Sequence, residues 1–198
     1  SDLGSTLGAS YYPNGPLSTD VYWLCAEDGS VVKVPGGHDD AWNNVFNIDG
    51  VGLYDQHAWT DYSPQYVSGL DSLYDLITCA IDPADHDHIY LGSWGEGLVE
   101  MNNGVVTNVY DDNNSILQSN IVYHWVAVGG MQFDTSGNLW MTNSHVMKCL
   151  VVKKADGTWK SFDFTGLIAI GETVSELMIT STGQKWMIDR KSTRLNSS

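Results

Sequence analysis

The sequence predicts an all-β protein, and within that class a β-propeller fragment of about three and a half four-stranded antiparallel blades. Short runs of apolar or alternating residues, separated by Gly, Asn and Asp, fill most of the chain and are typical of strands joined by tight turns. The same group of four runs recurs along the chain, as the blades of a propeller do. Eight Trp, ten Tyr and 20 Gly suit half-buried strands and turns, and no run of helical period is convincing.

The clearest copy of the repeating unit is Ile77–Tyr110. Its Asn102–Gly104 segment separates two alternating runs, which is a strong hairpin signal because both central residues of the turn must tolerate positive φ. The segment Asp85–His88 is predicted to be an exposed turn between the first two strands. The four strands are predicted at 77–82, 89–93, 98–101 and 105–110.

Further copies lie on both sides of this unit. Gly137 and Gly183 are 46 residues apart, and so are Trp140 and Trp186, a spacing within the range of propeller repeats. The copy that contains Trp186 stops after one hairpin. The blades are predicted at about residues 21–62, 77–110, 128–164 and 174–189.

Residues 1–190 are therefore predicted to form one partial β-propeller. A closed propeller typically has about 4–8 blades, so we expect the chain to be a fragment of a longer protein. The last residues, Lys191–Ser198, are polar and follow no strand pattern. They are expected to be a non-native tail of adapter or vector origin, with a natural terminal extension as the alternative.

The chain is strongly acidic, with 24 Asp and Glu against nine Lys and Arg and a net charge of −15. Such a surface repels phosphate backbones, which argues against nucleic acid or an anionic membrane surface as a partner. High solubility is the simpler interpretation of this charge, and a cation-binding acidic face is the alternative. No apolar run approaches the length of a transmembrane helix.

The chain contains three cysteines, Cys25, Cys79 and Cys149. They are too few and too scattered for a disulfide framework or a zinc site. Cys25 and Cys79 occupy the same place on the inner strands of successive predicted blades, which favours two small buried apolar residues over a bridge. Neither the compartment nor the redox state follows from this pattern.

Several motifs carry a resemblance to a known family. Asp134–Trp140 (DTSGNLW) matches Asp-x-x-Gly-Asn-Leu-Trp, the blade signature of propellers of the two-component-regulator type. Three further motifs narrow the match: Pro13–Pro16 (PNGP), Gly92–Leu98 (GSWGEGL) and Asn114–Gln118 (NSILQ). Over about residues 13–189 the chain resembles the N-terminal propeller of the PorZ family, a component of the type IX secretion system of Bacteroidetes-type bacteria.

The resemblance implies a non-catalytic accessory at the cell surface, on the outer face of the outer membrane. It implies protein partners, namely a sortase and the outer-membrane barrel-associated proteins that work with it in attaching secreted cargo. It also implies that the whole protein engages anionic lipopolysaccharide.

Two other functions stay open. A periplasmic glycan-sensing propeller of a hybrid two-component histidine kinase would share the Asp134–Trp140 signature but should lack the PNGP and NSxLQ motifs. A propeller enzyme would need charged residues where several inner strands begin, and those strands offer Thr78, Ala80, Gln132 and Met178 instead. We therefore expect no enzyme, no catalytic residues and no cofactor.

The longer predicted connections should gather on one face of the propeller, which is the expected binding surface. The sequence does not define a binding site, but four residues of these connections are candidates for stacking on a sugar or hydrogen bonding to it: Trp94, Glu96, His124 and Trp125. The alternative for Trp94 is packing between neighbouring blades.

Three short runs contain residue types that bind metal ions: Asp85–His88, Gly37–Asp40 and Asp111–Asn114. Alternate side chains of a tight turn point in opposite directions, so four ligands from one turn rarely converge on one ion. We interpret these runs as solvated turns and expect no metal site.

Overall fold

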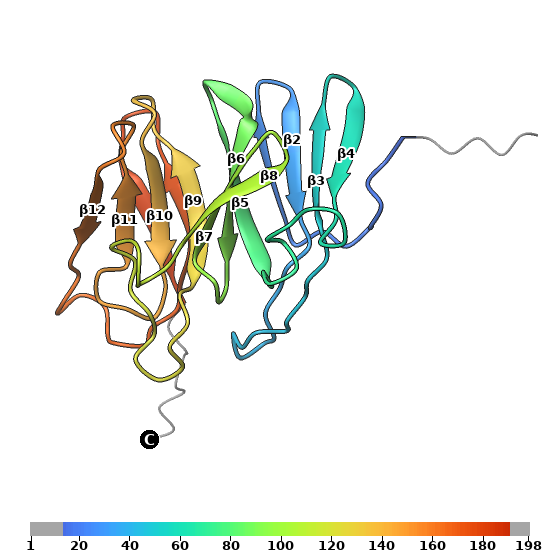
Figure 1. Cartoon of the computed structure of the whole chain (residues 1–198). Helices are drawn as coiled ribbons and strands as arrows, with labels where there is room; N and C mark the ends of the chain where they lie inside the picture. The colour runs from blue at the N-terminus through green and yellow to red at the C-terminus, as the bar shows by residue number, and fades with distance from the viewer. Residues whose placement is uncertain (1–13, 191–198) are drawn as a thin grey trace, which may run out of the picture.

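The computed structural model describes residues 14–190. Residues 1–13, which include the first Pro of the PNGP motif, and the predicted tail at 191–198 lie outside the described residues. Within 14–190 the chain forms fourteen strands and no helix. Figure 1 shows these strands as narrow sheets that stand side by side.

Three of the sheets have four antiparallel strands each, in chain order, and the last sheet has two strands. The first sheet consists of β1 (Trp23–Glu27), β2 (Ser30–Val34), β3 (Val51–Asp55) and β4 (Ala58–Tyr62). The second consists of β5 (Leu76–Asp82), β6 (Asp85–Ser93), β7 (Leu98–Asn102) and β8 (Val105–Tyr110). The third consists of β9 (Val128–Phe133), β10 (Leu139–Asn143), β11 (Leu150–Lys153) and β12 (Trp159–Phe162). The fourth consists of β13 (Val174–Ile179) and β14 (Lys185–Asp189). The predicted fold class, three and a half four-stranded antiparallel blades, is confirmed.

The hairpin between β7 and β8 has the predicted turn. Asn103 and Gly104 both adopt positive φ, at 49° and 75°. This is the backbone of a tight hairpin turn that continues the twist of the two strands.

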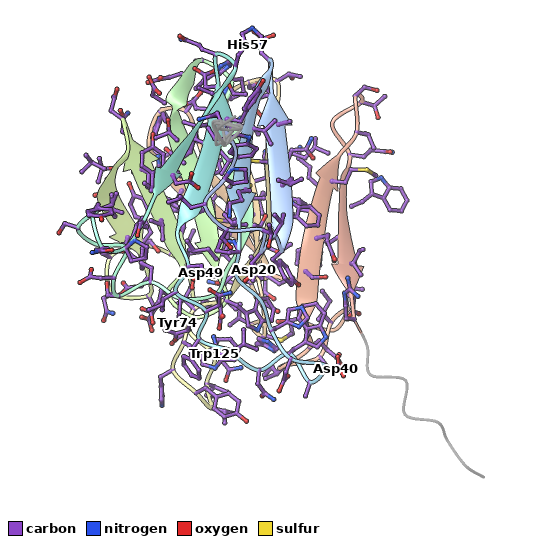
Figure 2. The ribbon with its side chains drawn as sticks, turned by 90° about the vertical axis from the view of Figure 1, so that its right-hand side faces the viewer. Asp20, Asp40, Asp49, His57, Tyr74 and Trp125 are labelled. Carbon is purple, nitrogen blue, oxygen red and sulfur yellow. The ribbon has the colours of Figure 1, made fainter. Side chains whose placement is uncertain are left out.

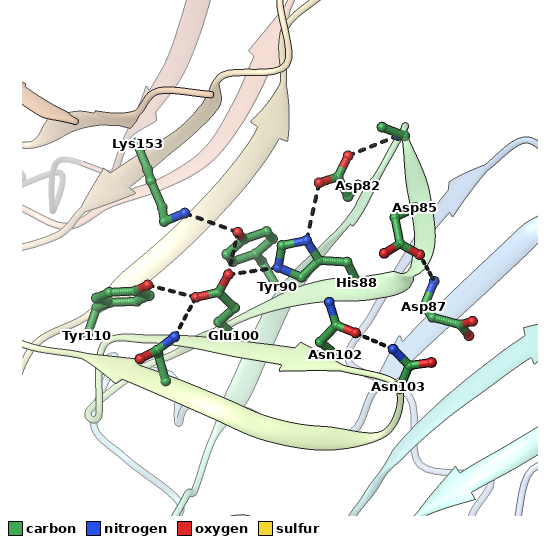
Figure 3. Close-up of polar contacts among 12 residues, drawn as sticks. Asp82, Asp85, Asp87, His88, Tyr90, Glu100, Asn102, Asn103, Tyr110 and Lys153 are labelled. Carbon is green, nitrogen blue, oxygen red and sulfur yellow. Dashed lines mark hydrogen bonds and ion pairs between the residues drawn. The ribbon is translucent and has the colours of Figure 1, made fainter. Parts of the chain in front are cut away.

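Asp85–His88 is part of a strand, so the prediction of an exposed turn was wrong. β5 and β6 are joined by only two turn residues, and β6 begins at Asp85. The ring of His88 lies between two carboxylates, with Nδ1 3.3 Å from Asp82 of β5 and Nε2 2.7 Å from Glu100 of β7 (Figure 3). Partners on neighbouring strands therefore hold this polar segment in the sheet, and its local composition does not decide its structure.

Apolar side chains fill the spaces between neighbouring sheets. Val32 of the first sheet and Ile81 of the second belong to one buried cluster. Ala80 of the second sheet and Met141 of the third belong to another. Since successive side chains of a strand point to opposite faces, β5 contributes Cys79 and Ile81 to the first cluster and Ala80 to the second.

The inner strands of the four sheets, β1, β5, β9 and β13, lie next to one another. Short hairpin turns lie at one end of the sheets, and the longer connections gather at the other end, the lower end in Figure 1. We call this end the loop face; its connections are 35–50, 63–75, 94–97, 111–127, 144–149 and 163–173. Among residues 14–190, no helix is long and apolar enough to cross a membrane.

Candidate functional site

A cavity of about 630 Å³ opens on the loop face. The connections after β2, β8, β10 and β12 line it, together with Arg190 at the end of β14. Figure 2 shows two of its lining residues, Asp40 and Trp125, at this end of the molecule, with His57 at the opposite end. The cavity therefore lies on the face where the sequence predicts binding.

Aromatic rings form the inner wall of the cavity and the layer beneath it. The ring centroid of Trp94 lies 5.3 Å from that of Trp42 and 5.9 Å from that of Trp125. Trp94 has no exposed surface, and its Nε1 donates a hydrogen bond to the carbonyl of Trp42 at 2.8 Å. Trp42 and Trp125 are half-buried and line the cavity, so Trp94 supports the two rings that a ligand would contact.

His145 completes the aromatic wall, with its ring centroid 5.5 Å from that of Trp125. Its Nδ1 lies 3.1 Å from the carbonyl oxygen of Gly171. Because a carbonyl only accepts, Nδ1 carries the proton, and Nε2 has a lone pair that meets no hydrogen-bond partner among residues 14–190. Burial lowers the pKa of His145 more than the Gly171 carbonyl raises it, so the imidazole is neutral at pH 7.

Three charged side chains border the cavity: Asp40, Glu172 and Arg190. The Arg190 guanidinium forms an ion pair with Glu176 and lies over the Trp42 ring, with 5.0 Å between Cζ and the ring centroid. Because Arg190 is paired, Asp40 and Glu172 make the rim acidic. Amide and hydroxyl groups of Asn43, Asn120 and Thr173 add neutral hydrogen-bonding groups to the lining.

A buried carboxylate holds one of the cavity loops. Asp75 is fully buried and accepts hydrogen bonds from three successive backbone N–H groups, those of Val45 and Phe46 at 3.0 Å and that of Asn47 at 2.9 Å. These donors would otherwise be unpaired in the loop that also carries Trp42. Asp75 therefore fixes the shape of the 35–50 connection.

Asn143, at the end of β10, holds the connection 111–127 in a similar way. Its Oδ1 accepts from the Gln118 N–H at 2.7 Å, and its Nδ2 donates to the Gln118 carbonyl at 3.0 Å. Asn143 is fully buried, so this pair of bonds forms away from water. The loop that carries Trp125 is thus attached to the rigid end of a strand.

A second cavity of about 230 Å³ adjoins the first and shares Tyr123 and Trp125 with it. Phe46 and Tyr74 form its other side, with 5.0 Å between their ring centroids. Burial, and then the neighbouring Glu96 carboxylate, raise the pKa of Tyr74, so its hydroxyl stays protonated. The two cavities form one aromatic surface across several connections.

Several residues of the loop face have unusual backbone geometry. Trp42, Phe46, His124 and His145 adopt positive φ, between 57° and 63°. Non-glycine residues rarely adopt this conformation, and such strained positions cluster at functional sites. The loops are therefore held in shapes that their own residues do not favour.

The four candidates from the sequence lie in different environments. Trp125 lines both cavities, whereas Trp94 lies fully buried beneath the first. Glu96 is half-buried beside Tyr74, and His124 is exposed. The structure thus brings only Trp125 of the four to the cavity wall.

Sequence reasoning missed most of the site. Trp42, Tyr123 and His145 line the first cavity, and Asp75 shapes one of its loops. Aromatic residues inside the long connections were a signal that could have identified Trp42 and Tyr123. No local signal marks His145 or Asp75, because their roles depend on partners in other connections.

In the acidic runs of the loop face, the carboxylates of Asp39 and Asp111 accept hydrogen bonds from N–H groups of the same turn. The Asp39 carboxylate accepts from the Ala41 N–H and from the Asn43 N–H and side-chain amide, at 2.8 to 2.9 Å. Asp111 accepts from the Asn113 N–H at 2.8 Å and from its side-chain amide at 3.0 Å. In the described part of the chain, no group of three or more His, Cys, Asp or Glu residues is arranged to hold a metal ion.

No protein-family model and no curated protein matches the chain. Among solved structures, the chain is similar to PorZ, an essential bacterial surface component of the type-IX secretion system of Porphyromonas gingivalis. The TM-score is 0.75 and the sequence identity 26%, and the match covers 91% of this chain and 24% of the PorZ chain.

Two more distant structures share the fold. The extracellular domain of the one component system BT4673 from B. thetaiotaomicron matches with a TM-score of 0.53 and 14% identity, over 89% of this chain and 21% of that one. A streptogramin B lyase matches with a TM-score of 0.54 and 14% identity, over 92% of this chain and 57% of that one. The fold therefore serves sensors and enzymes as well as secretion proteins.

The described chain is a PorZ-like β-propeller. The resemblance that the sequence motifs indicate is confirmed by the match to PorZ, which has the highest TM-score and identity of the three structures above. The chain spans about a quarter of the length of PorZ, 24%.

Proposed function

We propose that the chain is part of a non-catalytic cell-surface accessory of a type IX secretion system, acting outside the cytoplasm. The likeness to PorZ supports this proposal, since PorZ is a surface component of that system. The partners would be proteins of the attachment complex, namely the sortase and the outer-membrane barrel-associated proteins, together with the glycan of anionic lipopolysaccharide.

The observation that carries the binding proposal is the aromatic cavity of about 630 Å³ on the loop face. A sugar ring has apolar C–H faces that stack on aromatic rings, and Trp42, Tyr123 and Trp125 offer such rings. Its hydroxyl groups need hydrogen-bond partners, which Asn43 and Asn120 can supply. The cavity thus has the mixed aromatic and polar lining that a glycan requires.

The charge of the rim specifies which part of an anionic glycan would enter. Asp40 and Glu172 repel phosphate or carboxylate groups, and Arg190 is already paired with Glu176. A neutral sugar unit therefore occupies the cavity in our proposal, and the acidic substituents of the polysaccharide lie outside the rim.

Two of the three thiols, those of Cys79 and Cys149, support a non-catalytic role. Cys149 is fully buried, and burial raises its pKa to about 11, so the thiol stays protonated at pH 7. Cys79 is 1% exposed, and burial likewise raises its pKa. Neither thiol has the lowered pKa of a catalytic cysteine.

Titration of the chain with purified lipopolysaccharide, and with the polysaccharide released from its lipid, tests the proposal. Calorimetry is expected to give binding of both, and Trp125→Ala should weaken each by roughly tenfold or more, because it removes a stacking ring from the cavity. Trp186→Ala is the matched control, since Trp186 is a 60% exposed ring on β14, outside the cavity lining.

Equal affinities of wild type, Trp125→Ala and Trp186→Ala would contradict a glycan site in this cavity. Tight binding of short free oligosaccharides, with no gain from the longer polysaccharide, would favour the periplasmic glycan-sensing propeller of a two-component kinase instead.

A further inference from the structure

Cys25 and Cys79 face each other across the space between the first two sheets. Cys25 of β1 pairs with Val32 of β2 in the antiparallel register. The Cys79 thiol of β5 lies 3.5 Å from the Val32 carbonyl, to which it donates. The side chain of Cys79 therefore reaches the first sheet at the level of Cys25.

Both side chains contact the same buried cluster. Cys79 belongs to the cluster that fills the space between the first and second sheets, and Cys25 packs against that cluster from the inner strand β1. Burial, and then the adjacent Cys25 thiol, raise the pKa of Cys79. The two sulfur atoms are thus close enough to interact, in a region held by packing on both sides.

The two thiols differ in their access to solvent. Cys79 is 1% exposed, whereas Cys25 is half-buried. An oxidant can therefore reach Cys25 first, and Cys79 is placed to react second. The third cysteine, Cys149, lies next to β11 in the third sheet, apart from this pair.

We infer that Cys25 and Cys79 form a reversible disulfide that links the inner strands of neighbouring blades. The oxidant is a small-molecule or protein disulfide, R–S–S–R. The Cys25 thiolate attacks one of its sulfur atoms, forming a mixed disulfide and releasing one R–SH. The Cys79 thiolate then attacks the Cys25 sulfur and releases the second R–SH. Two protein thiols are oxidised, R–S–S–R is reduced, and the two thiol protons leave on the products.

The extracytoplasmic location proposed above is a compartment in which such a bond persists. The chemistry rests only on the geometry of the two thiols, and it is independent of glycan binding on the loop face. The bond would close the segment between residues 25 and 79 and fix the first blade to the second.

The chain of residues 1–198 carrying Cys149→Ala tests the inference, because only the two facing cysteines then remain. The protein is equilibrated with mixtures of reduced and oxidised glutathione, once folded and once in urea, and free thiols are then blocked and disulfides identified by mass spectrometry after a non-reducing digest. The folded protein is expected to give the Cys25–Cys79 cross-link, with an effective thiol concentration at least about 30-fold higher than in urea. The midpoint of thermal unfolding should rise by roughly 5–10 °C on oxidation.

Cys79→Ser in the same background is the matched control. It should give only glutathione attached to Cys25 and no rise in the unfolding midpoint. The inference is overturned if folded Cys149→Ala yields glutathione adducts or free thiols without the cross-link. It is also overturned if the effective concentration is equal in the folded and urea-unfolded chains, since the folded geometry would then contribute nothing.

Discussion

Glu100 of β7 is a buried carboxylate that gathers donors from the two neighbouring strands, β6 and β8 (Figure 3). It accepts hydrogen bonds at 2.7 to 2.9 Å from four side chains: Tyr90, Tyr110, His88 and Asn108. Lys153 of the next blade donates to the Tyr90 hydroxyl at 3.2 Å and so connects this network to the third sheet. Burial alone would raise the pKa of Glu100, but the four donors together lower it from 4.5 to about 2. The ionised carboxylate is therefore the form that stabilises the fold.

Glu100→Gln should lower the free energy of unfolding by about 2–3 kcal/mol at pH 7. The glutamine side chain keeps one acceptor oxygen, but its NH2 group places two N–H donors against neighbouring side chains that also donate. The folded pKa lies below the ordinary value, so the contribution of Glu100 is complete above about pH 4.5 and is lost as the pH falls toward 2. Urea unfolding of wild type and Glu100→Gln between pH 7 and roughly pH 3 measures this. The difference between their free energies of unfolding should shrink at the acidic end. Asp28→Asn, at an exposed turn, is the control and should track wild type. If the difference in free energy of unfolding stayed constant over this pH range, ionised Glu100 would not be the group that stabilises the fold.

At the scale of the element, the turn between β9 and β10 explains the blade signature. The Asp134 carboxylate accepts from the Ser136 N–H, the Asn138 N–H and side-chain amide, and Trp140 Nε1, at 2.8 to 3.0 Å. Gly137 supplies the positive φ of 74° that the turn requires. The Asp, Gly, Asn and Trp of the signature thus close the same hairpin, whereas Leu139 belongs to the buried apolar cluster.

Trp140→Ala should lower the free energy of unfolding by about 3 kcal/mol, because it removes a ring stacked on Phe162 of β12 and the hydrogen bond to Asp134. Asp112→Ala, at an exposed loop position, should cost less than about 0.5 kcal/mol. Urea unfolding followed by circular dichroism measures both. Small and equal effects would mean that the hairpin does not depend on its signature Trp.

At the scale of the whole molecule, the blades depend on close contact between inner strands. Gly130 of β9 lies against β13, where an added Cβ would come within 2.6 Å of the Leu177 backbone nitrogen. Backbone atoms cannot yield as a flexible side chain can, so only glycine allows this approach. The packing of one sheet on the next therefore rests on residues without side chains as well as on the apolar clusters.

Gly130→Ala is expected to separate β9 from β13 and to destabilise the chain by about 1–3 kcal/mol. Hydrogen exchange should quicken in β13 and β14, while the first sheet, β1 to β4, serves as an internal reference that keeps its protection. Uniform loss of protection in all sheets would show that the blades unfold as one unit, and unchanged exchange in β13 would contradict the contact.

The sequence by itself determined most of each strand, the order of the strands and the antiparallel meander of each blade. These features depend on neighbours along the chain: the alternation of β5, the Asn103-Gly104 turn and the Asp134 turn all act within a few residues. The loop face also followed, because chain order alone decides at which end of the sheets the long connections lie.

Only the tertiary structure decided which side chains meet. Asp75 accepts from residues about thirty positions away, Trp94 is buried beneath Trp42 from another blade, and the Cys79 thiol reaches a carbonyl of the first sheet. The strand at Asp85–His88 likewise depends on Glu100, a partner on the next strand. Such pairings follow from how twisted sheets pack side by side, and that packing sums many weak contacts between distant residues, so no local run of the sequence encodes it.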